Sequence, residues 1–289
     1  NNSNSFFWLS KETSIIINNW FMMYFLSVVL IGTIYPIFLE VLSSQKISVG
    51  PPFYHKLIIP FLIPFLMAMA IGPKLKWIKS NIVDKFYLVL FFAISIVLSF
   101  LIVKKFSTNL LINTILVSSA LYLFFITLRD FFIRKYSNIS QNIAHFGFSL
   151  LILSILLNNL FSSEIITNLK VGETFTSSKT KIVFKSINQK QEKNYKSIIA
   201  NFSIENINET IEDLSPELRI YNQPNIVTSE ADIKTTLLSD KFIVINIVQN
   251  QDYFNVRYQV KPFMLWIWIS VILISFGGLL SFFKREHEK

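Results

Sequence analysis

The stretch from Asn142 to Asn159 reads NIAHFGFSLLILSILLNN, and it decides the fold class of this chain. A helix needs roughly 17–25 mostly apolar residues to cross a bilayer, and this run is long enough. It contains one ionisable residue, His145. An imidazole inside a membrane is costly unless it has a partner, so His145 is a candidate functional residue. The alternative is that His145 hydrogen-bonds Gln141, one turn earlier, and only holds two helices together.

The composition extends this interpretation to the whole chain. Of its 289 residues, 52% are hydrophobic, 29 are Phe and only 16% are charged, which predicts a polytopic α-helical membrane protein. The net charge of +9 could indicate nucleic-acid binding, but the basic residues fall mainly in short loops beside apolar runs. In that position they act as topology signals. Cysteine is absent, so the chain offers no disulfide and no thiolate ligand to a metal.

Six apolar runs are expected to span the membrane. Between the first two, Pro51-Pro52 is expected to stop any helix within a loop over 40–56. The predicted spans are Ile15–Leu39, Leu57–Ile71, Asp84–Val103, Asn109–Leu128, Ile143–Phe161 and Phe263–Phe283.

The character of the sequence changes between the fifth and sixth spans. Residues 162–262 contain no run of spanning length, and several short segments alternate apolar with polar residues, which is typical of strands. This predicts an inserted extracytoplasmic antiparallel β domain, a barrel or sandwich. The expected division is a five-helix region at 1–161, the β domain at 162–262, and a final helix with a cytoplasmic tail at 263–289. The predicted strands are Lys181–Ile187, Ser197–Ile204, Phe242–Val248 and Phe254–Val260.

The basic residues of the short loops predict the orientation. Ten lie on one side of the predicted spans and four on the other, which places both termini in the cytoplasm or matrix and the β domain outside. The ten are Lys74, Lys76, Lys79, Lys85, Arg129, Arg134, Lys135, Lys284, Arg285 and Lys289, and the four are Lys46, Lys56, Lys104 and Lys105.

Eight motifs, in this order, resemble the CcmF family, the haem lyase subunits of cytochrome c maturation. The resemblance runs nearly from end to end. The motifs are SKETSIIINNW (10–20), GTIYPIFLE (32–40), KISVGPPFYHK (46–56), IGPKLKW (71–77), NIAHFGF (142–148), NLKVGETF (168–175), PELRIYNQPNIVTSEADIKT (216–235) and VKPFMLWIWISVILISFGGLL (260–280).

The resemblance implies a function. Members of this family join haem to the two cysteines of a C-x-x-C-H segment in apocytochrome c. The histidine of the segment that resembles NIAHFGF ligates a membrane haem b, so the resemblance makes His145 a haem-iron ligand. It also implies a haem chaperone and other haem lyase subunits as partners. The expected location is the bacterial inner membrane, or the mitochondrial inner membrane if the chain is organelle-encoded.

Parts of the family pattern are missing from this sequence. The tryptophan-rich W-x-W-D-type segment, the histidines that hold haem on the outer face and the membrane histidine opposite His145 all belong upstream. The chain is therefore expected to be the C-terminal part of such a subunit, inactive without its upstream half, and either a fragment or the product of a split gene. The nitrite-reductase-type haem lyase paralogue stays open, as does a transporter or non-catalytic scaffold.

Other candidate residues have simpler interpretations. His55 and His287 are expected to be solvated, and Trp266 and Trp268 to anchor the last span at the membrane interface. No hydrolase or kinase motif is visible, so no catalytic residue is assigned.

Overall fold

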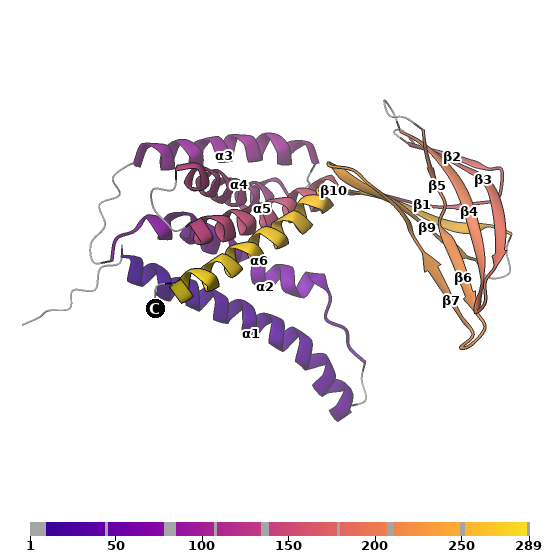
Figure 1. The fold of residues 1–289 in the computed structure, drawn as a ribbon, viewed down its shortest axis with the longest axis horizontal. Coiled ribbons are helices and arrows are strands. Elements are labelled where there is room, and N and C mark those ends of the chain that lie inside the picture. Colours follow the sequence, from indigo (N-terminus) through magenta and orange to yellow (C-terminus); the bar gives the residue numbers. More distant parts are fainter. Residues whose placement is uncertain are drawn as a thin grey trace, which may run out of the picture. The chain divides into compact units, whose positions relative to one another are not determined.

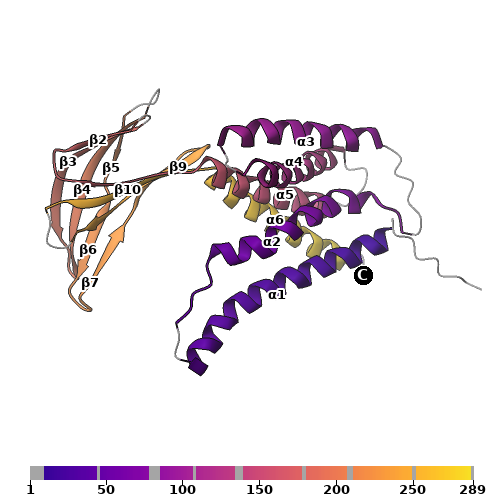
Figure 2. The same cartoon turned by 180° about the vertical axis from the view of Figure 1, so that it is seen from behind.

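The computed structural model describes residues 10–43, 46–77, 85–106, 109–133, 139–177, 180–206, 211–248 and 252–287 (Figures 1 and 2). The chain divides into two compact units. One contains residues 1–156 and 269–289 and is helical, and the other contains residues 157–268 and is mainly β. The boundary between the units therefore falls inside two helices, the fifth and the sixth.

The described residues include six helices long and apolar enough to cross a membrane, as the sequence predicts. They are α1 (Lys11–Ser43), α2 (Pro51–Ile71), α3 (Lys85–Phe106), α4 (Leu110–Ile133), α5 (Ile139–Phe161) and α6 (Met264–His287), and a short 3-10 turn, η1 (Gly72–Lys74), follows α2.

The start of α2 differs from the prediction. Pro51 and Pro52 do not stop a helix but occupy its first turn, directly after Gly50. Proline is tolerated there because the first backbone N–H groups of a helix have no intrahelical partner to lose. The prolines Pro60 and Pro64 lie inside the same helix.

The helix α4 is the most enclosed of the six. In its apolar segment 56% of the residues are buried, against 11% in α1 and in α6. The helix also runs to Ile133, past the predicted end of the fourth span at Leu128. Asp130, predicted to lie in a loop, is therefore a helical and buried residue.

The β unit is an antiparallel two-sheet sandwich. One sheet has the order β1-β10-β9-β8, and the other has the order β2-β3-β4-β6-β7 with β5 also paired to β4. The strands are β1 (Ser163–Leu169), β2 (Thr174–Thr176), β3 (Thr180–Gln191), β4 (Tyr195–Asn206), β5 (Glu212–Leu214), β6 (Glu217–Tyr221), β7 (Ile226–Glu230), β8 (Asp232–Thr235), β9 (Ser239–Ile247) and β10 (Phe254–Pro262).

Both sheets contribute to one hydrophobic core. Phe184 on β3 and Phe202 on β4 are directly paired and stack with ring centroids 4.4 Å apart. Ile243 on β9 and Tyr258 on β10 belong to the same buried cluster from the other sheet. Alternate residues of the long strands β3, β4, β9 and β10 are buried in this core, as expected where two half-buried sheets pack face to face.

Candidate functional site

The helix α5 carries His145 and presents three different faces to its surroundings. Residues three or four apart lie on the same face of a helix, so each face is a short series of side chains. The three faces contact α6, contact α4 and line a cavity.

The face toward α6 is made of small residues. A Cβ atom placed on Gly277 of α6 would lie 2.7 Å from the backbone nitrogen of Ala144, and one placed on Gly147 would lie 3.0 Å from Cγ1 of Ile274. Small residues allow helix backbones to approach this closely. Gly277 therefore has a packing role, whereas a Cβ on Gly278 would meet nothing within 4 Å.

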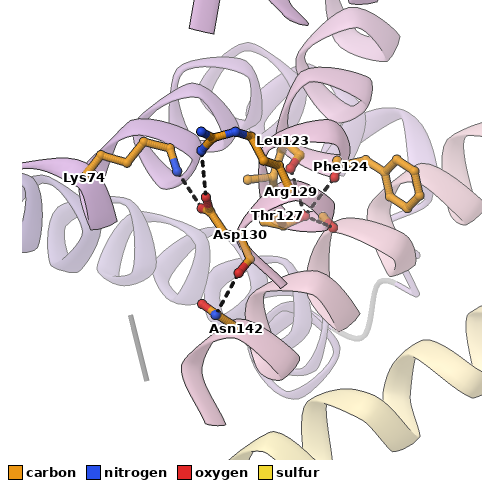
Figure 3. A network of polar contacts seen from close by, with 8 residues as sticks. Lys74, Leu123, Phe124, Thr127, Arg129, Asp130 and Asn142 are labelled. Atoms are coloured by element: carbon orange, nitrogen blue, oxygen red, sulfur yellow. Dashed lines mark hydrogen bonds and ion pairs between the residues drawn. The ribbon is translucent and has the colours of Figure 1, made fainter. Parts of the chain in front are cut away.

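The face toward α4 is polar. The hydroxyl oxygens of Ser149 and Thr127 lie 2.7 Å apart. The side-chain amide of Asn142 donates to the backbone carbonyl of Asp130 at 3.0 Å (Figure 3). These bonds fix the rotation of α5 about its own axis relative to α4.

The third face of α5 consists of Gln141, His145 and Phe148, which line a cavity of about 380 Å³. The other walls come from α1, α2 and η1, and they are mainly apolar. They include Ile15, Met22, Phe65 and Met69, with Lys11 and Asn18 as polar members. A predominantly apolar cavity of this size with a few polar groups is typical of a small-molecule or cofactor site.

His145 lies between this cavity and a group of charges. Its side chain is half-buried and also lines a smaller cavity together with Thr127, Asp130 and Asn142. Gln141 and Asn142 precede His145 by about one turn of α5 and are the neighbours that could orient its imidazole. Gln141 shares its cavity, while the Asn142 amide donates to the Asp130 carbonyl.

The charges form a cluster that the sequence did not predict. Lys74 Nζ lies 2.5 Å from Asp130 Oδ2, and Arg129 Nη1 lies 3.9 Å from Asp130 Oδ1 (Figure 3). The Arg129 guanidinium also lies over the ring of Tyr87, 3.6 Å from its centroid. Lys74, expected to be a loop charge, is thus buried. One feature of the sequence could have indicated that Asp130 lies inside the fourth helix. It is followed by the apolar residues 131–133, so the fourth apolar run resumes after it.

An isolated metal ion has no ligand set among the residues that the structure describes, because three or more His, Cys, Asp or Glu side chains do not come together in them. A macrocyclic cofactor is different, since its metal already has equatorial ligands and needs only axial ones. The donor chemistry around His145 therefore fits a haem better than a free ion.

His55, Trp266 and Trp268 are not among the residues that line this cavity. His55 lies in the first turns of α2 and is exposed, as expected for a solvated residue. The side chain of His287 is outside the described residues. Trp266 donates its indole N–H to the backbone carbonyl of Leu237 at 2.9 Å, and Trp268 is exposed.

The comparisons with known proteins agree on one family. A model described as the CcmF C-terminal beta-sandwich matches residues 160–262. The "Cytochrome c-type biogenesis protein CcmF" of Pseudomonas fluorescens is 27% identical over 96% of this chain and 44% of its own length. The CcmF of Escherichia coli K12 is 24% identical over 97% of this chain and 45% of its own length.

Two further matches also cover nearly the whole chain. The "Cytochrome c-type biogenesis protein NrfE" of Haemophilus influenzae is 23% identical over 98% of this chain and 46% of its own length. A solved structure named "Cytochrome c Heme Lyase CcmF" shares the fold, with a TM-score of 0.73 and 18% identity over 94% of this chain and 46% of that one. The chain thus spans less than half the length of these relatives.

Proposed function

We propose that this chain, which belongs to the CcmF family and matches the C-terminal part of its members, works as the C-terminal part of a membrane haem lyase subunit. The complete subunit would join haem to the C-x-x-C-H cysteines of apocytochrome c. The names of the curated relatives, cytochrome c-type biogenesis proteins, support this role. The absence of cysteine is compatible with it, because the reacting thiols would come from the apocytochrome.

The observation that carries the proposal is the position of His145 on the wall of the apolar cavity. We infer that this imidazole would ligate the iron of a haem b. Neutral imidazole is an established axial ligand of haem iron. The apolar side chains of Phe65, Met69 and Phe148 would contact the macrocycle, and the ammonium of Lys11 would pair with a haem carboxylate. When bound, the haem supplies one-electron exchange.

The position of Lys11 fits this task. Its backbone N–H donates to the carbonyl of Lys76 at 2.8 Å, which fixes the start of α1 beside η1. Its Nζ lies 5.1 Å from the centroid of the Trp77 ring, an attractive cation–π arrangement. The Lys11 ammonium is thus held at one wall of the cavity, where it could pair with a haem carboxylate.

The Lys74–Asp130 pair would act through position and not through contact with haem. It joins η1 to α4, and Asn142 attaches α5 to the same aspartate. Three structural elements around His145 are thereby held in place. The second axial ligand is expected from the upstream half of the subunit.

The remaining parts of the proposal follow the predicted division at 1–161, 162–262 and 263–289. The β sandwich contains neither His nor Cys, so docking of apocytochrome, of the haem chaperone or of other subunits suits it better than chemistry. We place it on the outer side of a bacterial inner membrane, or of the mitochondrial inner membrane if the chain is organelle-encoded. The match to NrfE supports a second candidate, the nitrite-reductase-type haem lyase.

A maturation assay tests the proposal. The chain, produced with its upstream half in a host that lacks its own haem lyase subunit, should restore covalent haem on a reporter cytochrome c. His145→Ala should abolish this haem staining, and the exposed control His55→Ala should retain it. Restored staining of a nitrite reductase alone would select the second candidate, and no staining of either would reject both.

A further inference from the structure

Two adjacent leucines at a hairpin tip of the β unit are strongly exposed. Leu237 and Leu238 connect β8 to β9, and 70% and 68% of their surfaces are accessible. The turn is closed by a hydrogen bond of 2.9 Å from the Thr236 N–H to the Ser239 carbonyl. Solvated turns favour Gly, Asn, Asp, Pro and Ser, so a pair of leucines in a tight turn is unusual and points to an apolar environment.

The same tip is bonded to the start of the last membrane helix. The carbonyl of Leu237 accepts a hydrogen bond from Trp266 Nε1 at 2.9 Å, and the carbonyl of Leu238 accepts one from the Phe263 N–H at 2.8 Å. Trp266 lies in the first turn of α6, and residues Met264–Phe283 of this helix are long and apolar enough to cross a membrane. The tip is therefore bonded to the first residues of a candidate membrane span.

The junction between the end of α5, the start of α6 and the hairpin is well defined. Phe263 has a φ of +62°, a conformation that is costly for a bulky residue and persists only where its surroundings enforce it. The Asn158 side chain donates to the Pro262 carbonyl at 2.5 Å, and the Phe161 and Phe263 rings lie 6.3 Å apart. The end of α5, the start of α6 and the hairpin thus form one fixed junction.

We propose that the Leu237–Leu238 tip inserts into the lipid interface beside α6 and anchors the sandwich to the bilayer surface. Apolar side chains next to an interfacial tryptophan favour this location. The hairpin carries its first charged residues on the two strand pairs next to the tip. Asp240 is paired with Thr235 on the first rung of the hairpin, and Lys234 is paired with Lys241 on the next. Charged groups at that depth would remain in the headgroup region.

The absence of native cysteine allows a direct test. Leu237→Cys and Leu238→Cys are made singly in the full chain, labelled with a nitroxide and reconstituted in vesicles of phosphatidylcholine and phosphatidylglycerol. Both sites are exposed, so the label should not disturb the core. Collision of the label with oxygen, which concentrates in lipid, is compared with collision with a water-soluble nickel chelate.

Asp252→Cys is the matched control. Asp252 is exposed and precedes β10, so about 30 Å of strand separates it from the junction. The proposal requires labels at 237 and 238 to favour oxygen several-fold over the label at 252. Equal, water-like values at all three sites would overturn it. Low collision with both reagents at 237 and 238 would also overturn it, because protein and not lipid would then cover the tip.

Discussion

Lys74 and Asp130 form an ion pair of 2.5 Å across 56 residues of sequence, with only 2% and 12% of their side-chain surfaces exposed. The pair joins the turn after α2 to the last turns of α4. A charge left alone at such a site costs about 3–5 kcal/mol, because the lost partner was its replacement for water. The pair is therefore expected to hold the helices around His145 in register.

We predict that substitutions of Asp130 and Lys74 reduce the stability of the helical unit by different amounts. Asp130→Asn should destabilise the helical unit by about 3–5 kcal/mol, because it leaves Lys74 and Arg129 as two neighbouring positive charges. Lys74→Met should cost less, since Arg129 can still partner Asp130. Chemical denaturation in detergent micelles measures both effects.

Lys185→Met provides the control for the ion-pair prediction. Lys185 Nζ lies 2.7 Å from Asp213 Oδ1, but the pair is exposed on the β unit. Its loss should change stability little, because solvent screens such pairs. Equal effects of Lys74→Met and Lys185→Met would show that burial does not decide the energetics here.

The two adjacent glycines of α6 should respond differently to alanine. Gly277→Ala should destabilise the α5–α6 contact by about 1–3 kcal/mol, since its Cβ would lie 2.7 Å from the Ala144 nitrogen. Gly278→Ala has open space and should be neutral or stabilising by up to about 1 kcal/mol, because alanine favours the helix. Thermal unfolding of the two variants compares them. Identical melting would argue against the close packing of α5 on α6.

Lys11→Gln should weaken haem retention about tenfold, since hydrogen bonds to charged groups contribute about 1.5–3 kcal/mol. It should also make the haem midpoint potential more negative, because a nearby positive charge stabilises the reduced form. The control is Lys76→Gln, which removes an exposed charge outside the cavity lining. If both variants shift the potential equally, Lys11 acts as a distant charge and has no specific partner.

The predicted orientation can be checked with single cysteines in the cysteine-free chain. An impermeant maleimide applied to intact cells should label Lys193→Cys, between β3 and β4, and should leave Ser137→Cys unlabelled until the cells are opened. The reason is the excess of basic residues on the side of Ser137. The reverse labelling pattern would invert the topology.

The sequence predicts the helices better than their ends and their charges. A long apolar run identifies a span, but its end depends on tertiary partners. α4 continues past Leu128 to Ile133, where Asp130 can be buried because it pairs with Lys74. That partner is 56 residues away in the sequence. Lys74 and Arg129 both lie in the cluster around Asp130. Without these two, the counted basic residues are eight against four, so the charge bias still has the same sign.

The β unit shows the same limit. Three of the predicted strands fall within β3, β4 and β10, and the fourth, Phe242–Val248, extends one residue past the end of β9 at Ile247. These four strands are long and clearly alternating. Short strands such as β2 and β5 have only three residues, too few to give a period. Their positions depend on pairing with β3 and β4. The same limit applies to the candidate site. The sequence singled out His145, but the cavity forms only where α1, α2 and α5 meet, so it could not be predicted.

Ligation of haem b by His145 can be tested with the absorption spectrum of the reduced, purified subunit. The subunit is assembled with its upstream half, as wild type, as His145→Ala and as the control His55→Ala. We expect the b-type α-band to weaken or vanish in His145→Ala alone, and added imidazole to restore part of it. Full haem occupancy with an unchanged spectrum in His145→Ala would rule out this ligation and leave His145 as a residue that only holds helices together.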